Sequence, residues 1–290
     1  MNDKFYLLTA VAAAIEAGRA ILDVYRSSDF KIEKKADKSP LTLADRRSHE
    51  VIVKRLGKLA IPILSEEGKD IPYVERKSWE TYWLIDPLDG TKEFIKQNGE
   101  FTVNIAMIRD RKPLGGVIYV PDKDVLYFAL NDQGSFKVDS GDSIKQLETD
   151  LIETLNNQAG GPGNEKIAET FDSIIAAAAK LPVYDLPDRP FTIIGSRSHA
   201  TPELKAFVED KRKEHGEVEF ISAGSSLKLC LVAEGRADIY PRTGPTMEWD
   251  TAAGQAIAEN AGCKVLQYET NEPLIYNKEN LLNPWFVVSR

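Results

Sequence analysis

The fold of this chain is decided by one stretch, Trp83-Leu84-Ile85-Asp86-Pro87-Leu88-Asp89-Gly90-Thr91-Lys92-Glu93-Phe94. The apolar run from Tyr82 to Ile85 predicts a buried strand. Pro87 is expected to break that strand, because proline cannot donate a ladder hydrogen bond. Gly90 permits a tight turn, after which a helix can begin. Asp86 and Asp89 are therefore expected at a strand tip that faces a helix N-terminus.

Two carboxylates at such a tip have the chemistry of a magnesium site. Magnesium is usually held by one or two carboxylates together with substrate phosphate oxygens. The backbone N–H groups of Gly90 and Thr91 are suited to an anion at the start of the helix. An aspartate-rich turn that only caps a helix fits the short pattern Asp-x-x-Asp-Gly equally well, so this pattern alone leaves both interpretations open.

The longer string Asp86-Pro87-Leu88-Asp89-Gly90-Thr91-Lys92-Glu93-Phe94-Ile95 is far more specific. It resembles the signature of the inositol monophosphatase superfamily, whose members are magnesium-dependent, lithium-sensitive phosphatases. Its ending is most similar to the 3′(2′),5′-bisphosphate nucleotidase branch, the CysQ type, which acts in sulfur metabolism. A second superfamily signature follows in the right order at 248–254, where the sequence is Glu248-Trp249-Asp250-Thr251-Ala252-Ala253-Gly254.

The resemblance covers roughly residues 1–138 and 191–290, and it implies a layered αβαβα sandwich in which an α+β half meets an α/β half. We expect an N-terminal metal-binding domain over 1–140 and a C-terminal substrate-binding domain over 191–290. Residues 141–190 lie outside the resemblance, and a flap, an oligomer contact and a decoration are all open for them. Four apolar runs between 101 and 138 predict an antiparallel sheet, and a helix is expected over 165–180.

The resemblance also implies a ligand set. One magnesium ion is expected on Glu66, Asp86 and the carbonyl oxygen of Leu88. A second is expected on Asp86, Asp89 and Asp250, and the family allows a third, weaker ion. From the residues alone, a glutamate pair at 66–67 is typical of a solvated turn, and Asp250 is suited to cap a helix over 251–261.

Water activation is assigned by the same resemblance. Asp45 orients Thr91, and the pair receives a proton from the attacking water, with Glu66 counted among the catalytic residues. The pattern Thr42-x-x-Asp45 on its own fits a variant of the capping box. Both interpretations remain open at this point.

The implied substrate is adenosine 3′,5′-bisphosphate, hydrolysed to AMP and phosphate, and 3′-phosphoadenylyl sulfate is a second candidate. The branch would hold the non-scissile phosphate on Ser225 and Lys228, the base on His199 and a further part of the substrate on Arg242. The scissile end would contact residues of the metal site, namely Glu66, Leu88, Asp89, Gly90, Thr91 and Asp250. An inositol or sugar phosphate phosphatase is the alternative enzyme, and a non-catalytic nucleotide or metal sensor is a remote one.

Bulk properties narrow the protein class further. A net charge of −8 disfavours a broad nucleic-acid-binding face, so the expected partner is a small nucleotide. Cys230 and Cys263 lack metal-site spacing, which favours packed thiols in a reducing cytoplasm. The apolar run from Phe5 to Ile15 has the length of a signal peptide, but its pattern continues helically to Asp23 and favours an amphipathic first helix. No membrane-spanning run is expected, although peripheral association with the inner membrane face stays open, as does the oligomeric state.

Overall fold

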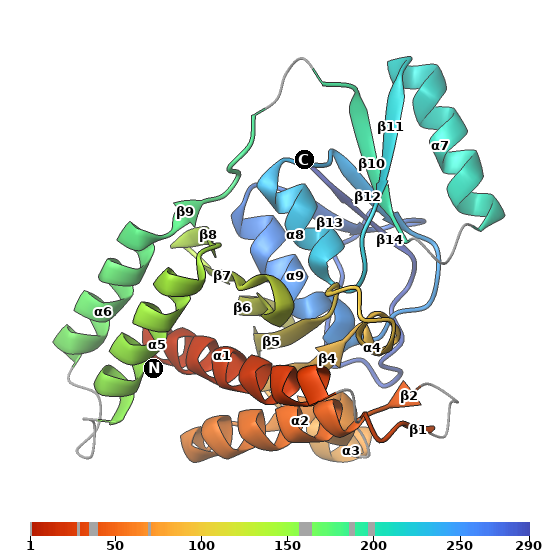
Figure 1. Cartoon of the computed structure of the whole chain (residues 1–290). Helices are drawn as coiled ribbons and strands as arrows, with labels where there is room; N and C mark the ends of the chain where they lie inside the picture. Colours follow the sequence, from red (N-terminus) through yellow and green to blue (C-terminus); the bar gives the residue numbers. More distant parts are fainter. Residues whose placement is uncertain are drawn as a thin grey trace.

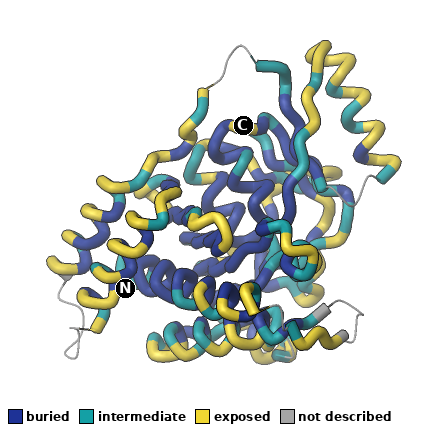
Figure 2. The backbone as a smooth tube through the Cα atoms, viewed as in Figure 1, coloured by how far each residue is buried: buried dark blue, intermediate teal, exposed yellow. Residues whose placement is uncertain are grey.

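The computed structural model describes residues 2–27, 30–34, 40–68, 71–156, 164–185, 189–196 and 201–290. These residues form alternating layers of helices and sheets, so the predicted αβαβα sandwich is confirmed (Figure 1). In order, the layers are α1 with α2, a seven-stranded sheet, α8 with α9, a five-stranded sheet, and α7. Buried residues concentrate in α1, the large sheet and the helices between the two sheets (Figure 2).

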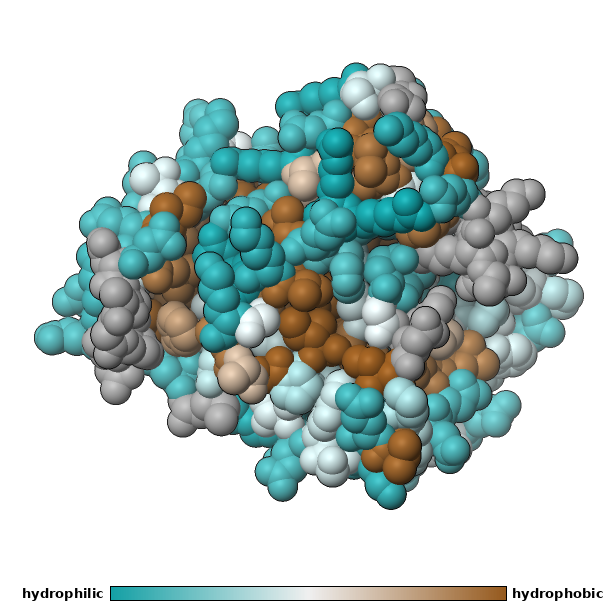
Figure 3. Space-filling view, turned by 90° about the horizontal axis from the view of Figure 1, so that it is seen from below, coloured by the Kyte–Doolittle hydropathy of each residue, from teal (hydrophilic) through white to brown (hydrophobic). Residues whose placement is uncertain are grey.

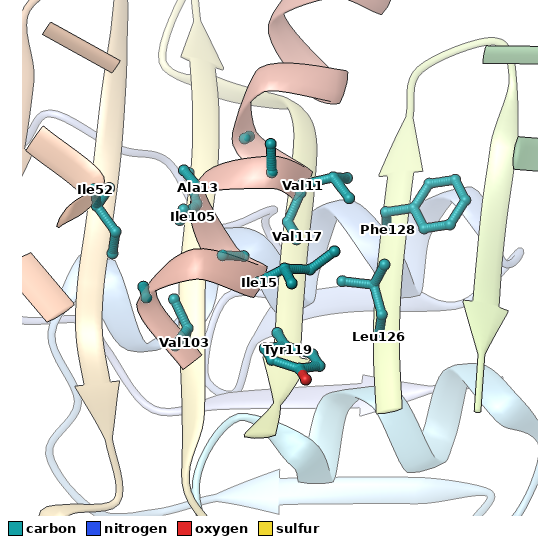
Figure 4. Packing of buried hydrophobic residues seen from close by; sticks show 14 of the residues in the cluster. Val11, Ala13, Ile15, Ile52, Val103, Ile105, Val117, Tyr119, Leu126 and Phe128 are labelled. Atoms are coloured by element: carbon teal, nitrogen blue, oxygen red, sulfur yellow. The ribbon is translucent and has the colours of Figure 1, made fainter. Parts of the chain in front are cut away.

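The outer layer beneath the large sheet consists of α1 (Asp3–Ser27) and α2 (Leu43–Leu56). Val11 and Ile15 of α1 lie over Ile105 and Val117 of the sheet, where all four side chains are buried (Figure 4). The apolar positions of α1 recur at helical spacing, so one side of the helix is covered by the sheet. The predicted amphipathic first helix is thus part of the hydrophobic core.

By length and composition, α1 would also satisfy the criteria for a membrane span. However, 67% of its most apolar window is buried inside the protein. Core helices of soluble proteins meet the same criteria, and the covered face of α1 is accounted for by the sheet. The molecular face seen from below is mainly hydrophilic, with separate hydrophobic patches (Figure 3).

The large sheet has the strand order β3-β4-β5-β6-β7-β8-β9. Its strands are β3 (Ile63–Ser65), β4 (Thr81–Asp89), β5 (Thr102–Arg109), β6 (Lys112–Val120), β7 (Val125–Leu130), β8 (Gly134–Val138) and β9 (Ala179–Lys180). All neighbours are antiparallel except β3 and β4, so the antiparallel sheet predicted over 101–138 is confirmed.

The prediction that Pro87 ends the strand is wrong. β4 continues through Pro87 to Asp89, and its register against β5 shifts between Asp86 and Asp89. A proline is tolerated at such a bulge, where no ladder hydrogen bond is required of it. The N–H of Leu88 donates instead to Asp86 Oδ1, at 3.0 Å.

The middle segment contains α5 (Gly141–Asn156) and α6 (Asn164–Ala177). The predicted helix over 165–180 is confirmed in α6, but α5 was not predicted. Buried residues of both helices, such as Leu151 and Phe171, join the hydrophobic cluster around α1. The helices therefore complete the outer layer beside α1, and the division of the chain at residues 140 and 190 stays a proposal.

The smaller sheet has the order β11-β10-β12-β14-β13. It consists of β10 (Phe191–Gly195), β11 (Val218–Ser222), β12 (Ile239–Arg242), β13 (Lys264–Gln267) and β14 (Phe286–Ser289). α7 (Pro202–His215) packs on its outer face, and α8 (Leu227–Glu234) and α9 (Glu248–Asn260) fill the layer between the sheets. Short elements complete the fold: β1 (Glu33–Lys34), β2 (Pro40–Leu41), η1 (Gly57–Leu59), η2 (Glu66–Gly68), α3 (Tyr73–Arg76), α4 (Thr91–Ile95) and η3 (Pro121–Lys123).

The start of α9 also differs from its prediction. The helix begins at Glu248, so Asp250 lies within its first turn and is not the cap residue. Its Oδ2 accepts a hydrogen bond from the backbone N–H of Met247, at 2.8 Å. The carboxylate thus satisfies an N-terminal donor of the helix from inside the first turn, as the fourth residue of a capping box does.

Candidate active site

Asp45 and Thr91 meet although 46 residues separate them in the sequence. Asp45 Oδ2 accepts hydrogen bonds from the N–H and the hydroxyl of Thr42, at 2.7 and 2.6 Å. Its other oxygen accepts from Thr91 Oγ1, at 3.3 Å. The capping box at the start of α2 and the contact with Thr91 therefore coexist in one buried carboxylate.

The tip of β4 is fixed by the bulge and by α2. Asp86 is 2% exposed and accepts from the N–H of Leu88. Ser48 of α2 donates to the carbonyl oxygen of Pro87, at 2.6 Å. The hydroxyl of Thr91 also lies 3.4 Å from the carbonyl oxygen of Leu88, so this turn is held on both sides.

Asp89 lies where the two halves of the molecule meet. Its Oδ2 accepts from the N–H of Ser226, at 2.6 Å, and from Asn104 Nδ2, at 3.4 Å. Ser226 immediately precedes α8, whereas Asn104 belongs to β5. The carboxylate is therefore oriented by donors from both halves.

The start of α8 presents polar groups beside Asp89. Ser225 adopts a left-handed backbone with φ +46°, an uncommon conformation for a residue other than glycine. Lys228 is buried, and its Nζ donates to the carbonyl oxygens of Ser225 and Ala223, at 2.6 and 3.3 Å. Lys228 is therefore not a solvent-exposed helix lysine, although it lies in the first turn of α8.

One cavity of about 150 Å³ joins these groups. Six predicted site residues line it: Asp89, Gly90, Ser225, Lys228, Arg242 and Asp250. The sequence did not assign a site role to its other lining residues. Three of them belong to the two signatures, namely Lys92, Glu93 and Thr251, and the others are Ser196, Gly224, Ser226, Leu229, Tyr240, Thr246 and Phe286. Several of these directly adjoin predicted residues in the sequence, and that adjacency is the signal which could have found them. His199 lies outside the described residues.

Charges in the cavity perturb one another. Burial raises the pKa of Asp250 to about 8, and the carboxylates of Asp89 and Glu66 add to the rise. Burial likewise raises the pKa of Asp89, although Lys228 and the two hydrogen bonds oppose it. The pKa of Lys228 is lowered by burial to about 8. The site thus confines negative charges that a bound cation would stabilise.

These carboxylates fit a divalent cation. Asp89 and Asp250 are partly buried and line the same cavity, and the carboxylate of Asp89 raises the pKa of Asp250. Oxygen donors of this kind are what magnesium requires. Within the described ranges, no three acidic, histidine or cysteine side chains are gathered closely enough to form a ready-made metal cluster. The wider ligand set with Glu66, Asp86 and Leu88 therefore stays a prediction.

A layered αβαβα sandwich with paired carboxylates in a cavity between its halves defines the class of sugar-phosphatase-like proteins. Comparison with known proteins agrees, because the model of the inositol monophosphatase family matches residues 3–285. The chain belongs to the inositol monophosphatase family.

Relatives within the family are similar over nearly the whole chain. The 3′(2′),5′-bisphosphate nucleotidase CysQ of Shigella flexneri is 43% identical over 281 residues, covering 95% of this chain and 96% of the relative. The crystal structure of CysQ from Bacteroides thetaiotaomicron is 49% identical, with a TM-score of 0.82 and coverage of 98% and 96%. The SuhB protein of Bartonella henselae, 23% identical with a TM-score of 0.69 over 97% of this chain and 92% of its own, shares the fold.

Proposed function

We propose that this chain is a magnesium-dependent 3′(2′),5′-bisphosphate nucleotidase that hydrolyses adenosine 3′,5′-bisphosphate to AMP and phosphate. A second substrate of the proposal is 3′-phosphoadenylyl sulfate. The single observation that carries it is that one cavity contains two groups of opposite charge. The carboxylates Asp89 and Asp250 form a binding place for a cation, the cation seat, and the cationic groups Lys228 and Arg242 form one for an anion, the anion seat. The names of the relatives with 43% and 49% identity support the same activity.

The two seats suit a substrate with two phosphate groups. Magnesium on Asp89 and Asp250, together with Glu66, Asp86 and the carbonyl of Leu88, would supply electrostatic stabilisation of the scissile phosphate and of the attacking water. The second phosphate would lie at the start of α8, where Ser225 and Lys228 offer a hydroxyl and an ammonium group. Arg242 lines the same cavity and adds positive charge.

Asp45 and Thr91 are suited to move the proton. As the water oxygen forms its bond to phosphorus, the bond from phosphorus to the 3′ oxygen breaks, and the 3′ oxygen leaves with the bonding electron pair and takes a proton from solvent to become the 3′-hydroxyl of AMP. The water proton passes to Thr91 Oγ1 while the threonine proton passes to Asp45 Oδ1, along the 3.3 Å hydrogen bond. Asp45 is held for this task by the two donors of Thr42. No covalent intermediate with the protein is part of the proposal.

The proposal includes a cytoplasmic site of action. Cys230 and Cys263 are both buried, and neither forms a disulfide. Unlinked thiols of this kind are typical of a reducing compartment.

The proposal is tested by phosphate release from adenosine 3′,5′-bisphosphate and from inositol 1-phosphate. We expect the bisphosphate to have the higher kcat/KM, and Lys228→Met to reduce that value at least about tenfold, since a charge-assisted hydrogen bond to phosphate contributes about 1.5–3 kcal/mol. The inositol ester has no second phosphate, so Lys228→Met should change its kcat/KM much less.

A matched control is Lys213→Met, which removes an exposed lysine of α7 that pairs with Asp210. This variant should keep the kcat/KM of the unmodified protein for both substrates. Faster turnover of inositol 1-phosphate would reject the nucleotidase in favour of the inositol phosphatase. Absence of phosphate release from both esters with magnesium present would favour the sensor.

A further inference from the structure

A buried group of polar side chains connects the start of α8 to the large sheet. Thr102 and Asn104 lie two residues apart on β5, so their side chains share one face of that sheet. The hydroxyl of Ser226 donates to Asn104 Oδ1 at 2.7 Å and lies 2.9 Å from Thr102 Oγ1. All three side chains are at most 2% exposed. Water therefore offers them no alternative partners, and the group holds Ser226 in one position.

The same Ser226 orients the Asp89 carboxylate through its backbone. Its N–H and Asn104 Nδ2 both donate to Asp89 Oδ2. In the part of the chain that the structure describes, Asp89 Oδ1 accepts no hydrogen bond, and Asp89 lines the cavity. Donors behind a metal-binding carboxylate fix its orientation and its basicity, so Ser226 bears on cation binding without touching the ion.

Ser226 is also joined to the anion seat. It follows Ser225, whose left-handed backbone is retained because the loop is tied on both sides. On one side the N–H of Gly224 donates to Glu100 Oε2, at 2.8 Å, and on the other Lys228 holds the Ser225 carbonyl. The Ser225 carbonyl that Lys228 holds and the Ser226 N–H that holds Asp89 belong to the same peptide unit, so a phosphate bound at Ser225 and Lys228 acts directly on that N–H.

We propose that Ser226 is a positioning residue which couples occupation of the anion seat to cation binding at Asp89, with Thr102 holding its hydroxyl in place. The inference rests on the proposed function, because it takes the second phosphate of a bisphosphate nucleotide as the occupant of the seat. Such coupling is reciprocal: a phosphate at Ser225 tightens magnesium binding, and magnesium tightens phosphate binding to the same extent.

Titration calorimetry with magnesium chloride tests this coupling without catalysis. The magnesium Kd is measured in saturating AMP and in saturating adenosine, which differ only in the 5′-phosphate. In the unmodified protein AMP should lower the Kd at least about fivefold more than adenosine does, the lower end of typical coupling between sites. In Ser226→Ala and in Thr102→Val, the Kd values in AMP and adenosine should differ by less than about twofold, since the coupling contact is lost.

The matched control is Thr154→Ala, which removes a buried hydroxyl bonded to Thr170 between α5 and α6, outside the cavity. It should keep the AMP-to-adenosine ratio of the unmodified protein. If Ser226→Ala does not fold, Thr102→Val decides, because valine keeps the shape of threonine. A ratio retained in the folded serine and threonine variants, or a ratio near one in the unmodified protein, overturns the inference. Failure of the proposed function is seen separately, as absence of phosphate release from adenosine 3′,5′-bisphosphate.

Discussion

Asp45 combines a structural and a chemical task in one side chain. One of its oxygens completes the capping box of α2, while the other accepts from Thr91. A carboxylate that two donors already hold in place loses little conformational freedom when it accepts a proton. It is therefore well organised for proton transfer.

This pairing predicts the effect of Asp45→Asn. Asparagine keeps the size of the side chain but removes the charge that receives the proton, so kcat should fall by about 10²–10⁴-fold while KM changes little. Thr91→Val should cause a similar fall. Because the two residues act as one unit, the double variant should be little worse than either single one. Unchanged phosphate release in Asp45→Asn, measured under saturating magnesium, would contradict the assignment.

At the residue scale, the sequence predicted which residues interact locally better than it predicted how deeply each side chain is buried. The capping box at Thr42 and Asp45 follows from local spacing, and the structure confirms it. The burial of Lys228 is instead a matter of tertiary packing, in which the centroid of the Tyr240 ring lies 5.5 Å from Lys228 Nζ. Twelve residues of chain separate the two, and no local pattern reports that contact.

Among the elements, the packing of α9 on the large sheet brings Asp250 to the cavity. A Cβ added to Gly116 of β6 would lie 2.6 Å from the carbonyl oxygen of Ala253 and 2.8 Å from its Cα. Both atoms belong to the backbone of α9, which cannot turn aside as a side chain can. The backbones of β6 and α9 therefore approach each other closely at Gly116.

Gly116→Ala should consequently force β6 and α9 apart. We expect a loss of about 1–3 kcal/mol in the free energy of unfolding, the usual cost of overpacking, together with weaker magnesium binding. The control is Gly57→Ala, where an added Cβ meets nothing within 4 Å and the backbone is helical, with φ −61°. That substitution should leave stability unchanged or raise it by up to about 1 kcal/mol. Superimposable urea unfolding curves for Gly116→Ala and Gly57→Ala would argue against the close contact between β6 and α9.

Most elements were predictable from periodicity, and the exceptions have physical causes. The strands β5 to β8 and the helix α6 follow from their apolar patterns. α5 was missed although Ile144, Leu147 and Leu151 recur at helical spacing, so the signal is present in the sequence. The path of β4 through Pro87 was not predictable in the same way, because the bulge depends on the hydrogen bond from Leu88 to Asp86.

On the scale of the whole molecule, folding brings together carboxylates that are far apart in the sequence. Asp89 ends a strand of the large sheet, and Asp250 lies in the first turn of α9. Without a cation, the mutual repulsion of Asp89, Asp250 and Glu66 opposes the fold. The superfamily signatures predicted this meeting, whereas the lining residue Thr246 lies outside both signatures.

The resulting pH dependence has a definite sign. Folding raises the pKa of Asp250 from 3.8 to about 8, so between these values the folded state binds the proton more tightly than the unfolded state. The unfolding free energy therefore falls as pH rises through this window. In EDTA at pH 8, Asp250→Asn should raise the Tm by at least about 2 °C, the shift expected for roughly 1 kcal/mol, and by less at pH 5.

Magnesium should reverse the ranking at pH 8. Because it binds the folded state, it should raise the Tm of the unmodified protein more than that of Asp250→Asn. Asp172→Asn is the control, since this exposed carboxylate pairs with Lys4 at the surface, and its Tm should follow the unmodified protein at each pH. Parallel profiles of Tm against pH for Asp250→Asn and the unmodified protein would show that folding does not raise the pKa of Asp250.

The strand order of the smaller sheet has a consequence for biosynthesis. β14 lies between β12 and β13, although it is translated after both of them. A nascent chain that ends before residue 286 thus presents two unpaired strand edges with nothing between them, and such edges are prone to aggregate. This sheet closes only after its last strand has left the ribosome exit tunnel, so during translation its strand edges stay unpaired longer than those of the large sheet do.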